Sequence, residues 1–476
     1  KNMKQVVCSA PGKVLITGGY LVLFRPFSGL VLTVNARFST SINSIAKDEP
    51  IIEVESPQFQ RQEVFRVGVP EISLNPTNDD HEHNPYTENA ILITLITIQH
   101  LIGKDKFMHI LKKGMHITIQ GDNAFYSQRD QLLARSLPLT SASLATLPRF
   151  LKNVSNTKES LSNIKKTGLG SSAALVTSLV AALYVYFDVG SIPSFLSEPT
   201  KFSSDELSNL KFVHNLAQYC HCVAQKKIGS GFDVSSAVFG SQRYVRFTDT
   251  ILRPLLDSNK CPSGENILHV MNSDWDNQYD KFALPRGMSL LLGDVSKGSN
   301  TPNMVSKVLA WKASSDDAES IIQSLAKLNS MTEDCFRKVR DLEKTLGHET
   351  YDKYLAECAT NPSNQWPNLK NNSLAMLLTE LRNSFLGVRS HLRNIGHRAE
   401  VDIEPPSQQK LNDLTMDITG VLIAGVPGAG GYDAVFAILL NPAVSQVVEE
   451  CWVKQEVLPL ILSEQPIGVC VEASQN

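Results

Sequence analysis

Two glycines followed directly by two serines form the stretch of this sequence that is best suited to chemistry. Gly168 and Gly170 enclose a single residue, and Ser171 and Ser172 come next. Glycine allows a tight turn and a close approach of the backbone to a ligand. The segment that follows has apolar residues at helical spacing, namely Leu175, Leu179, Ala182 and Leu183. The pattern therefore predicts a glycine turn that opens a helix.

A helix that begins at such a turn presents unpaired N–H groups at the positive end of its dipole. These groups form a site for an anion, most often phosphate. The hydroxyl groups of Ser171 and Ser172 can add hydrogen bonds or a ligand for Mg²⁺. The plainer alternative is a glycine turn that only begins a helix of the core.

Two other nucleotide motifs fit this stretch less well. No Gly-Lys-Ser/Thr follows the glycines, which excludes a Walker A loop. The letters Gly168-x-Gly170-x-x-Ala173 do match the dinucleotide fingerprint. However, residues 160–166 are polar and do not resemble a buried strand, and Asp188, the acid 20 residues after Gly168, directly follows the helix. Dinucleotide binding remains an alternative.

Lys13 and Asp233 are two charged residues that regular elements should hold in place. Lys13 follows a Pro-Gly break and precedes residues 14–23, which we expect to form a strand with a glycine interruption. Asp233 follows a Gly-Ser-Gly loop at the end of a helix expected over residues 204–227. A solvated lysine and a turn aspartate are the competing interpretations.

The remaining pattern predicts a mixture of helices and strands. In the first half we expect a strand at 5–8, a break at 9–13, antiparallel strands in 33–69, a polar loop at 73–84, a helix from Asn84-Pro85 to about 102, a strand at 116–120 and a long loop over 121–165. In the second half we expect an irregular domain join at 248–285, strands at 288–292, 420–424 and 434–440, and mostly helices over 314–397. Two hydroxyl- or glycine-rich loops follow strands, at 293–302 and 425–433.

Composition limits the class of protein. The 476 residues suffice for two or three domains, and the net charge of −3 gives no general attraction to nucleic acid or membrane. The eight cysteines are scattered without zinc-site spacing, which suits a reducing compartment. Cys220-His221-Cys222 lies on the expected helix, where residues i and i+2 diverge, so a metal is not expected there. The longest apolar run, 173–187, is too short and interrupted to span a bilayer.

Three blocks of the sequence together resemble the GHMP kinase superfamily. They are Pro11-Gly12-Lys13, the segment from Gly168 to Ala174, and Pro427-Gly428-Ala429-Gly430-Gly431. Within that superfamily, residues 9–23, 166–172, 214–218 and 229–234 look like phosphomevalonate kinases. The resemblance covers nearly the whole chain and is strongest to the eukaryotic form, particularly that of plants.

The resemblance implies an α+β fold of two domains with the active site in the cleft between them. Residues 1–250 would form the nucleotide-binding domain and residues 285–476 the C-terminal domain. The implied reaction moves the γ-phosphoryl group of ATP onto 5-phosphomevalonate, with Mg²⁺, in the route from mevalonate to isoprenoids and sterols. The implied partner is a small molecule, with neither nucleic acid nor membrane. The oligomeric state stays open, a monomer included, and we expect a cytoplasmic protein with a peroxisomal pool left open.

The resemblance also carries residue roles. Lys13 and Asp233 match catalytic positions, and Ser172 matches a Mg²⁺ ligand that Asp233 would join. The nucleotide phosphate loop would comprise Lys166, Thr167, Gly168, Leu169, Gly170, Ser171, Ser172 and Ala173. Because a phosphate monoester, with a second pKa of about 6, is already mostly dianionic at neutral pH, a general base is less necessary, and Asp233 would then position Lys13 or the metal.

A doubly charged acceptor needs cations around it. Lys227, Arg243 and Lys297 are the candidates, and each could equally be a solvated surface charge. Ser299, Thr301 and Gly430 would complete the substrate site.

Two departures from the family pattern stand out. Gly18-Gly19 replaces the Gly-Glu of many relatives, and residues 223–227 lack the glutamate that binds Mg²⁺ in mevalonate kinase. Water, phosphates and Asp233 would complete the metal shell.

Several alternatives stay open at this point. Another small-molecule kinase of the superfamily, mevalonate kinase above all, would use the same blocks. A sensor that binds nucleotide and substrate without turnover would also retain them, although the presence of Lys13, Ser172 and Asp233 argues against it. Tight NAD binding without ATP binding would favour a dehydrogenase. A panel of substrates with ATP and Mg²⁺ separates these functions.

Overall fold

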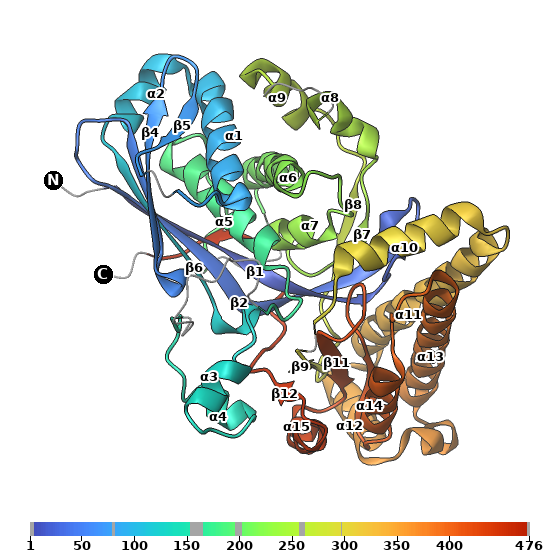
Figure 1. The fold of residues 1–476 in the computed structure, drawn as a ribbon. Helices are drawn as coiled ribbons and strands as arrows, with labels where there is room; N and C mark the ends of the chain where they lie inside the picture. Colours follow the sequence, from blue (N-terminus) through green and yellow to red (C-terminus); the bar gives the residue numbers. More distant parts are fainter. Residues whose placement is uncertain are drawn as a thin grey trace.

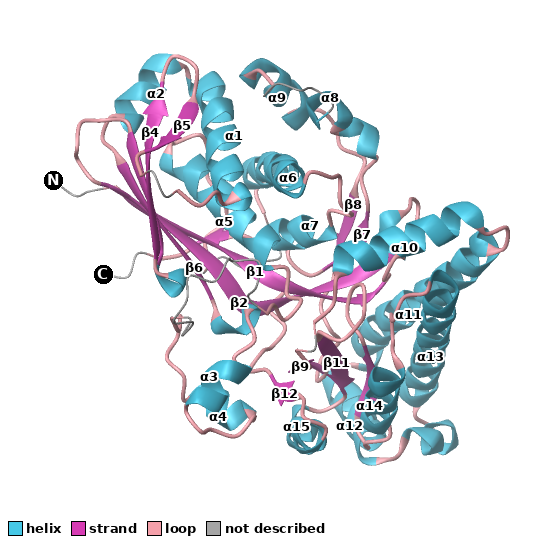
Figure 2. Ribbon diagram, in the orientation of Figure 1, coloured by secondary structure: helices cyan, strands magenta, loops and turns pink. Residues whose placement is uncertain are grey.

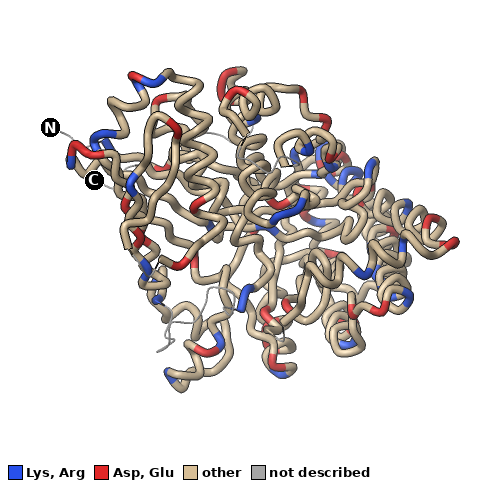
Figure 3. The backbone as a smooth tube through the Cα atoms, turned by 45° about the horizontal axis from the view of Figure 1, so that its top comes forward, with Lys and Arg blue, Asp and Glu red and all other residues tan. Residues whose placement is uncertain are grey.

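Two β-sheets organise the chain in this computed structural model, which describes residues 4–78, 81–152, 165–195, 202–256, 262–296 and 298–473. The larger sheet carries helices α1, α5, α6 and α7 together on one face, and the smaller sheet is covered by helices of the C-terminal third (Figure 1). Figure 2 separates the two sheets from their helices most clearly. In Figure 3 basic and acidic residues are interspersed along the tube, as the small net charge suggests.

Two long antiparallel strands, β1 (Gln5–Thr17) and β2 (Ser28–Ser44), form the centre of the larger sheet. The strand order is β13-β1-β2-β6-β3-β4-β5, and a two-stranded extension, β7 and β8, pairs with β2. The other members of this sheet are β3 (Ile51–Ser56), β4 (Arg61–Gly68), β5 (Ser73–Pro76), β6 (Met115–Gly121), β7 (Gln242–Val245), β8 (Gln278–Lys281) and β13 (Cys470–Val471).

The first segment differs from its prediction. The expected break at 9–13 is wrong, because β1 runs through Pro11, Gly12 and Lys13 with a register shift against β2. Such an irregularity lets a proline, which has no N–H to donate, sit inside a strand. The strand ends at Thr17, six residues earlier than the predicted end at residue 23, and Leu21–Leu23 forms a short 3₁₀ helix. Gly18 marks the end with a φ of +93°.

Three helices behind the larger sheet, α1, α5 and α6, were predicted correctly, whereas the short helix α7 was not expected. Helix α1 (Pro85–Ile102) begins at Asn84, whose side chain accepts from the N–H groups of Tyr86 and Thr87. Helix α5 (Ser171–Tyr186) begins directly after Gly170 and is buried on almost every side. Helix α6 (Ser204–Gln225) begins with the capping box of Ser203 and Glu206 and is followed by α7 (Phe232–Phe239). Helix α5 therefore begins at one glycine loop, and a second glycine loop joins the end of α6 to the start of α7.

The smaller sheet has the order β10-β11-β9-β12 and confirms the strands expected in the second half. Its members are β9 (Ser289–Asp294), β10 (Val421–Gly425), β11 (Ala434–Leu439) and β12 (Leu458–Pro459). The helices around it are α10 (Thr301–Ser314), α11 (Ala318–Leu346), α12 (His348–Thr360), α13 (Ser373–Ala399), α14 (Pro406–Met416) and α15 (Ser445–Lys454). Among the helices that the structure describes, none is long and apolar enough to cross a membrane.

Three segments expected to be irregular contain regular structure. The polar loop at 73–84 includes the edge strand β5. Residues 121–152 include the short helices α3 (Arg129–Ala134) and α4 (Ser141–Ala145), while 153–164 lie outside the described residues. The expected join at 248–285 holds α8 (Arg253–Leu256), α9 (Gly264–Met271) and β8, which pairs within the larger sheet. The C-terminal strand β13 also pairs with β1 in the larger sheet. The predicted division of the chain into domains 1–250 and 285–476 stays a prediction.

Candidate active site

The three glycine blocks meet around strand β1. The backbone N–H of Lys13 donates to the carbonyl oxygen of Leu169 at 2.9 Å, which joins the first block to the second. The N–H of Gly428 donates to the carbonyl oxygen of Leu15 at 3.3 Å, which joins the third block to β1 two residues beyond the first block. A Cβ at Gly19 would lie only 2.7 Å from the carbonyl oxygen of Gly428. The lack of a side chain at Gly19 therefore lets the turn after β1 lie against the third block.

The side chain of Lys13 lies between the middle block and helix α7. Its Nζ donates to the carbonyl oxygen of Gly168 at 2.9 Å and lies 5.1 Å from the ring centre of Phe232. Burial lowers the pKa of this ammonium, and the charge of Asp233 opposes that effect. Lys13 and Asp233 are thus close enough to interact electrostatically, as expected of two residues in one site.

Gly170 has a conformation and a neighbour that both require glycine. Its φ is +74°, and a Cβ at this position would lie 2.9 Å from Cε and 3.2 Å from Cγ of Lys13. Gly168 also has a positive φ, of +79°. Thr167 anchors the loop, because its N–H donates to the carbonyl oxygen of Phe125 at 3.2 Å. The predicted loop of residues 166–173 therefore presents the first turn of α5 beside the lysine.

Ser172 contacts a histidine that sequence reasoning had not placed in the site. Its Oγ lies 3.0 Å from Nε2 of His221, and Nε2 of Gln225 lies 3.2 Å from the same atom. His221 is buried, and burial lowers its pKa, so we assign the neutral imidazole. Because the amide of Gln225 can only donate there, Nε2 acts as an acceptor, and the Ser172 hydroxyl then points its proton toward His221.

Asp233 lies in the first turn of α7, held by the loop that precedes it. Its Oδ1 accepts from the N–H of Val234 at 2.9 Å. Gly231 has a φ of +75°, and its carbonyl oxygen accepts from Nε2 of Gln218 on α6 at 2.7 Å. Helix α6 therefore fixes the loop that carries Asp233. The negative charge of Asp233 also reaches His221, where it raises the pKa against the effect of burial.

The predicted substrate residues divide into two groups. Ser299 and the third glycine block are brought together, since Oγ of Ser299 accepts from the N–H of Tyr432 at 2.7 Å. Gly430 has a φ of +78°, and a Cβ there would lie 2.1 Å from the carbonyl oxygen of Ile403, so only glycine fits. Thr301 is exposed at the start of α10. Lys297 lies outside the described residues.

The two other basic candidates lie at different places. Lys227 is exposed just beyond the end of α6, and its charge reaches His221. Arg243 on β7 makes ion pairs with Glu333 of α11, at 3.0 Å, and with Asp280 of β8, at 3.6 Å. A substrate phosphate would have to compete with these two carboxylates for the guanidinium group. The binding roles of both residues stay predictions.

A pair of acidic residues beneath the third block, one buried and one half-buried, was also missed. Asp294 is fully buried and accepts from the hydroxyl groups of Ser127, at 2.7 Å, and Ser296. Burial and the charge of Asp294 raise the pKa of Asp433 to about 6. Both aspartates belong to segments noted in the sequence as polar loops after strands. Their proximity was not visible there, because it depends on the pairing of β9 with β11.

A cavity of about 410 Å³ opens at the start of α5. Its polar lining includes Ser56, Arg61, Lys166, Ser171, Ser172 and the segment 82–84, which leads into α1. Its apolar lining includes the aromatic rings of Phe38, Phe59, Tyr86 and Tyr126. A pocket with aromatic walls beside a helix N-terminus can hold a planar ring system whose attached anion faces the N–H groups.

Comparisons with known proteins place relatives beside nearly the whole chain. No protein-family model matches the chain. It is 40% identical to "Phosphomevalonate kinase, peroxisomal" of Arabidopsis thaliana, over 98% of this chain and 96% of the relative. It is 30% identical to "Phosphomevalonate kinase" of Candida albicans, over 98% of each chain.

Solved structures show the same fold at low sequence identity. A Listeria innocua protein, Lin0012, superposes with a TM-score of 0.64 at 17% identity, covering 98% of this chain and 99% of that one. The Streptococcus pneumoniae phosphomevalonate kinase in complex with phosphomevalonate and AMPPNP superposes with a TM-score of 0.59 at 13% identity, covering 97% and 100%. The α+β fold is thus that of the GHMP kinases. Given the curated relatives at 40% and 30% identity over nearly their full lengths, the chain belongs to the phosphomevalonate kinase family.

Proposed function

We propose that this protein transfers the γ-phosphoryl group of ATP onto the phosphate of 5-phosphomevalonate, forming 5-diphosphomevalonate and ADP. The observation that carries the proposal is the position of Lys13. Its ammonium group lies between the carbonyl oxygen of Gly168 and the ring of Phe232, with the Asp233 charge near enough to act on it. A cation between a helix N-terminus and a carboxylate suits phosphoryl transfer, which depends mainly on positioning and charge neutralisation.

The nucleotide would occupy the cavity at the start of α5. The free N–H groups of Ser171 and its neighbours would bind phosphate oxygens, and the aromatic walls would contact the base. The Streptococcus pneumoniae phosphomevalonate kinase was solved in complex with phosphomevalonate and AMPPNP, which supports the same pair of ligand classes here. Residues 166–173 would form the phosphate loop.

The donor set near α5 fits Mg²⁺. Ser172 and Asp233 supply the hydroxyl and carboxylate oxygens that this ion prefers, and His221 holds the Ser172 hydroxyl so that its lone pairs are free. When bound, Mg²⁺ would neutralise charge on the phosphates of the nucleotide. Residues 223–227 lack the glutamate that binds Mg²⁺ in mevalonate kinase, and the nearby His221, as a neutral imidazole, would orient the serine without adding negative charge.

The acceptor needs little help from a base. Its phosphate is mostly dianionic at neutral pH, since its second pKa is about 6. The role of Asp233 is then to counter the desolvation of Lys13 and keep its ammonium charged during transfer. The acceptor would bind in the cleft between the two proposed domains, to Ser299, Thr301, Gly430, Lys227, Arg243 and Lys297.

The name of the Arabidopsis relative supports a peroxisomal pool of this protein beside a cytoplasmic one. Fractionation of cells that produce the full-length protein would test this.

An ADP-release assay with a panel of acceptors tests the proposal. With ATP and Mg²⁺ we expect turnover of 5-phosphomevalonate and none with mevalonate above the blank. Preference for mevalonate would make the chain a mevalonate kinase. Binding of both ligands without ADP release would make it a sensor, and either result would reject the proposal.

A further inference from the structure

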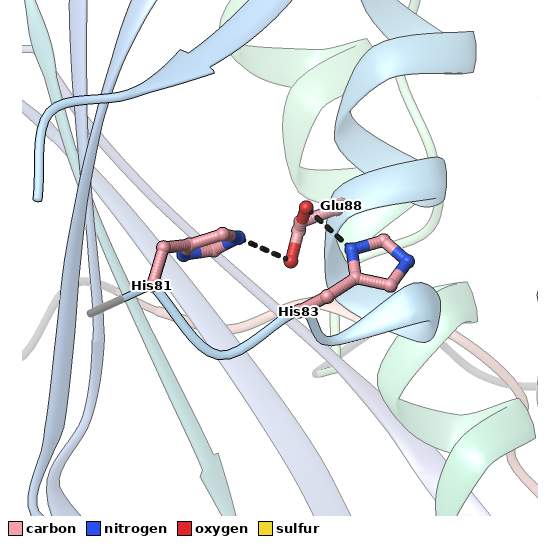
Figure 4. A group of neighbouring side chains, drawn as sticks. All are labelled: His81, His83 and Glu88. Atoms are coloured by element: carbon pink, nitrogen blue, oxygen red, sulfur yellow. Dashed lines mark hydrogen bonds and ion pairs between the residues drawn. The ribbon is translucent and has the colours of Figure 1, made fainter. Parts of the chain in front are cut away.

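Three side chains with metal-binding atoms converge beside the start of α1, outside the glycine blocks (Figure 4). Oε1 of Glu88 lies 3.1 Å from Nε2 of His81, and Oε2 of Glu88 lies 2.7 Å from Nδ1 of His83. One ligand atom from each of the three residues can be chosen so that all lie within 4.8 Å of one another. Within the described part of the chain, His81, His83 and Glu88 form the one set of at least three histidine, cysteine, aspartate or glutamate residues whose ligand atoms lie this close together.

The local structure explains why the two histidines face the same carboxylate. Residues 81–84 run without helical structure into α1, and both imidazole rings point toward Glu88 in Figure 4. Between them, Glu82 instead forms an ion pair with Arg61. In a non-helical segment, alternate side chains can share one side, which the helical Cys220-His221-Cys222 segment does not allow.

Two further contacts orient these side chains as a metal site would require. Nδ1 of His81 lies 2.8 Å from Oε2 of Glu63 on β4, which leaves Nε2 to face Glu88. A carboxylate on the far nitrogen is the usual partner of a metal-binding histidine, because it fixes the tautomer and the ring. Oε1 of Glu88 accepts from the N–H of Asn84 at 2.6 Å, which fixes the carboxylate.

The three side chains differ in how far they are exposed to solvent. The side chain of His81 is 13% exposed and that of Glu88 is 16% exposed, whereas that of His83 is 62% exposed. An ion could therefore enter from solvent at His83 and keep water in its remaining position. Imidazole and carboxylate ligands suit first-row transition metals better than Mg²⁺, which prefers oxygen alone.

We propose that His81, His83 and Glu88 bind a divalent transition-metal ion of the Zn²⁺ class, with Glu63 as the residue that orients His81. This site is separate from the Mg²⁺ site proposed at Ser172 and Asp233. It adjoins the nucleotide cavity, which His83 and Asn84 help to line. A bound ion would tie residues 81–83 to the first turn of α1. The competing explanation is a hydrogen-bonded network in which both imidazoles interact with Glu88 and no ion is needed.

The test is metal binding by the full chain after treatment with a chelator, without nucleotide. Zn²⁺ is titrated in competition with a chromophoric chelator, and Co²⁺ is added separately to record its visible spectrum. We expect one tightly bound Zn²⁺ per chain, with affinity at least about tenfold weaker in His81→Gln and His83→Gln, and about 10–100-fold weaker in Glu63→Gln. The matched control is His109→Gln, an exposed histidine on α2 (Lys104–Leu111), which should bind like the wild type.

Thermal unfolding supplies a second readout on the same samples. Zn²⁺ should raise the unfolding temperature of the wild type and the control variant but not that of His83→Gln, because an ion that binds only the folded state stabilises it. Since His83 is mostly exposed, its replacement should leave the metal-free protein folded. Equal Zn²⁺ affinity in the wild type and in both histidine variants would overturn the proposal. So would a Co²⁺ spectrum dominated by thiolate ligation, or binding no tighter than that of the double variant His81→Gln/His83→Gln.

Discussion

Nζ of Lys13 donates a hydrogen bond to the carbonyl oxygen of Gly168 at 2.9 Å, so the lysine of the first glycine block is held directly on the second. The two residues are 155 positions apart in the sequence. A cation fixed in this way does not have to be ordered during the reaction. In a partly desolvated cleft, a preorganised charge stabilises a transition state more strongly than the same charge in water.

Replacement of Lys13 by methionine should therefore reduce turnover more than binding. The change keeps the apolar stem that packs on Gly170 and removes only the ammonium group. We expect kcat to fall on the order of a hundredfold, while nucleotide affinity changes less because the N–H groups of α5 remain. The measurement is kcat and nucleotide affinity on one folded sample, with exposed Lys112→Met as the control. A kcat within about threefold of wild type would contradict the role of Lys13.

Gly170→Ala should weaken nucleotide binding, because the new Cβ would lie 2.9 Å from Cε of Lys13. The lysine stem or the loop would have to shift. Gly103→Ala is a control for a positive φ without a neighbour, since Gly103 has a φ of +81° and a ψ of +155° but no atom within 4 Å of its Cβ position. Backbone strain should cost Gly170→Ala, in the left-handed helical region, about 1 kcal/mol of stability, and should cost Gly103→Ala more, up to about 3 kcal/mol, because its φ and ψ suit glycine almost exclusively. Only Gly170→Ala should raise the nucleotide dissociation constant, by about tenfold or more; equal affinities in the two variants would argue against the phosphate loop.

Asp233→Asn should fold normally, because the asparagine Oδ1 can still accept from the N–H of Val234. The variant loses the charge that opposes the desolvation of Lys13. We expect a large loss of kcat with a modest change in KM, since the charge matters most in the transition state. Steady-state kinetics with both substrates measure the two constants. If most of kcat survives, Asp233 serves only to shape the turn before α7.

His221 should matter through Ser172. In His221→Leu the half-buried Ser172 hydroxyl, which lines the cavity, loses the acceptor that orients it, and the net loss of one hydrogen bond costs about 0.5–1.5 kcal/mol. The side chain of His221→Gln can still accept from that hydroxyl. We expect the leucine variant to need more Mg²⁺ for half-maximal activity and to bind Mn²⁺ more weakly in the presence of nucleotide, with both properties recovered by glutamine. Equal metal dependence in the two variants would show that His221 is only a core residue.

Glu464 provides a prediction about stability and pH. Burial raises its pKa from 4.5 to about 7, although the N–H of Leu284 donates to both oxygens at 3.1 Å. A carboxyl group whose pKa is higher in the folded than in the unfolded protein stabilises the fold fully at a pH below its unfolded pKa. That stabilisation is lost as the pH rises through its folded pKa. Because glutamine does not ionise, the Glu464→Gln variant does not lose stability in this way. Its stability relative to the wild type should therefore increase between about pH 4.5 and pH 7, on the order of 3 kcal/mol, and stay constant above.

Denaturant unfolding at several pH values measures this difference. Exposed Glu71→Gln is the control and should show no such trend. A stability difference between Glu464→Gln and wild type that is independent of pH would mean that Glu464 ionises in the folded protein as it does in the unfolded chain.

The sequence predicted those parts of the fold and site that depend on local patterns. Caps at Asn84 and Ser203 located the starts of α1 and α6, and Gly170 located the start of α5, because each signal acts within a few residues. Strand β1 was misjudged, since Pro-Gly in a sequence normally marks a break and only the pairing with β2 keeps it extended. The His221–Ser172 contact and the Asp294–Asp433 pair depend on packing between distant elements, which periodicity does not reveal.

The most direct test of the central claim is ³¹P NMR of one reaction containing ATP, Mg²⁺ and equal amounts of mevalonate and 5-phosphomevalonate. We predict that the signal of the phosphate monoester is replaced by the paired signals of a diphosphate ester, that ADP accumulates in equal amount, and that mevalonate stays unphosphorylated. The same reaction with Lys13→Met should be slower on the order of a hundredfold. Appearance of phosphomevalonate from mevalonate, or no new diphosphate ester with the wild-type protein, would contradict the proposed activity.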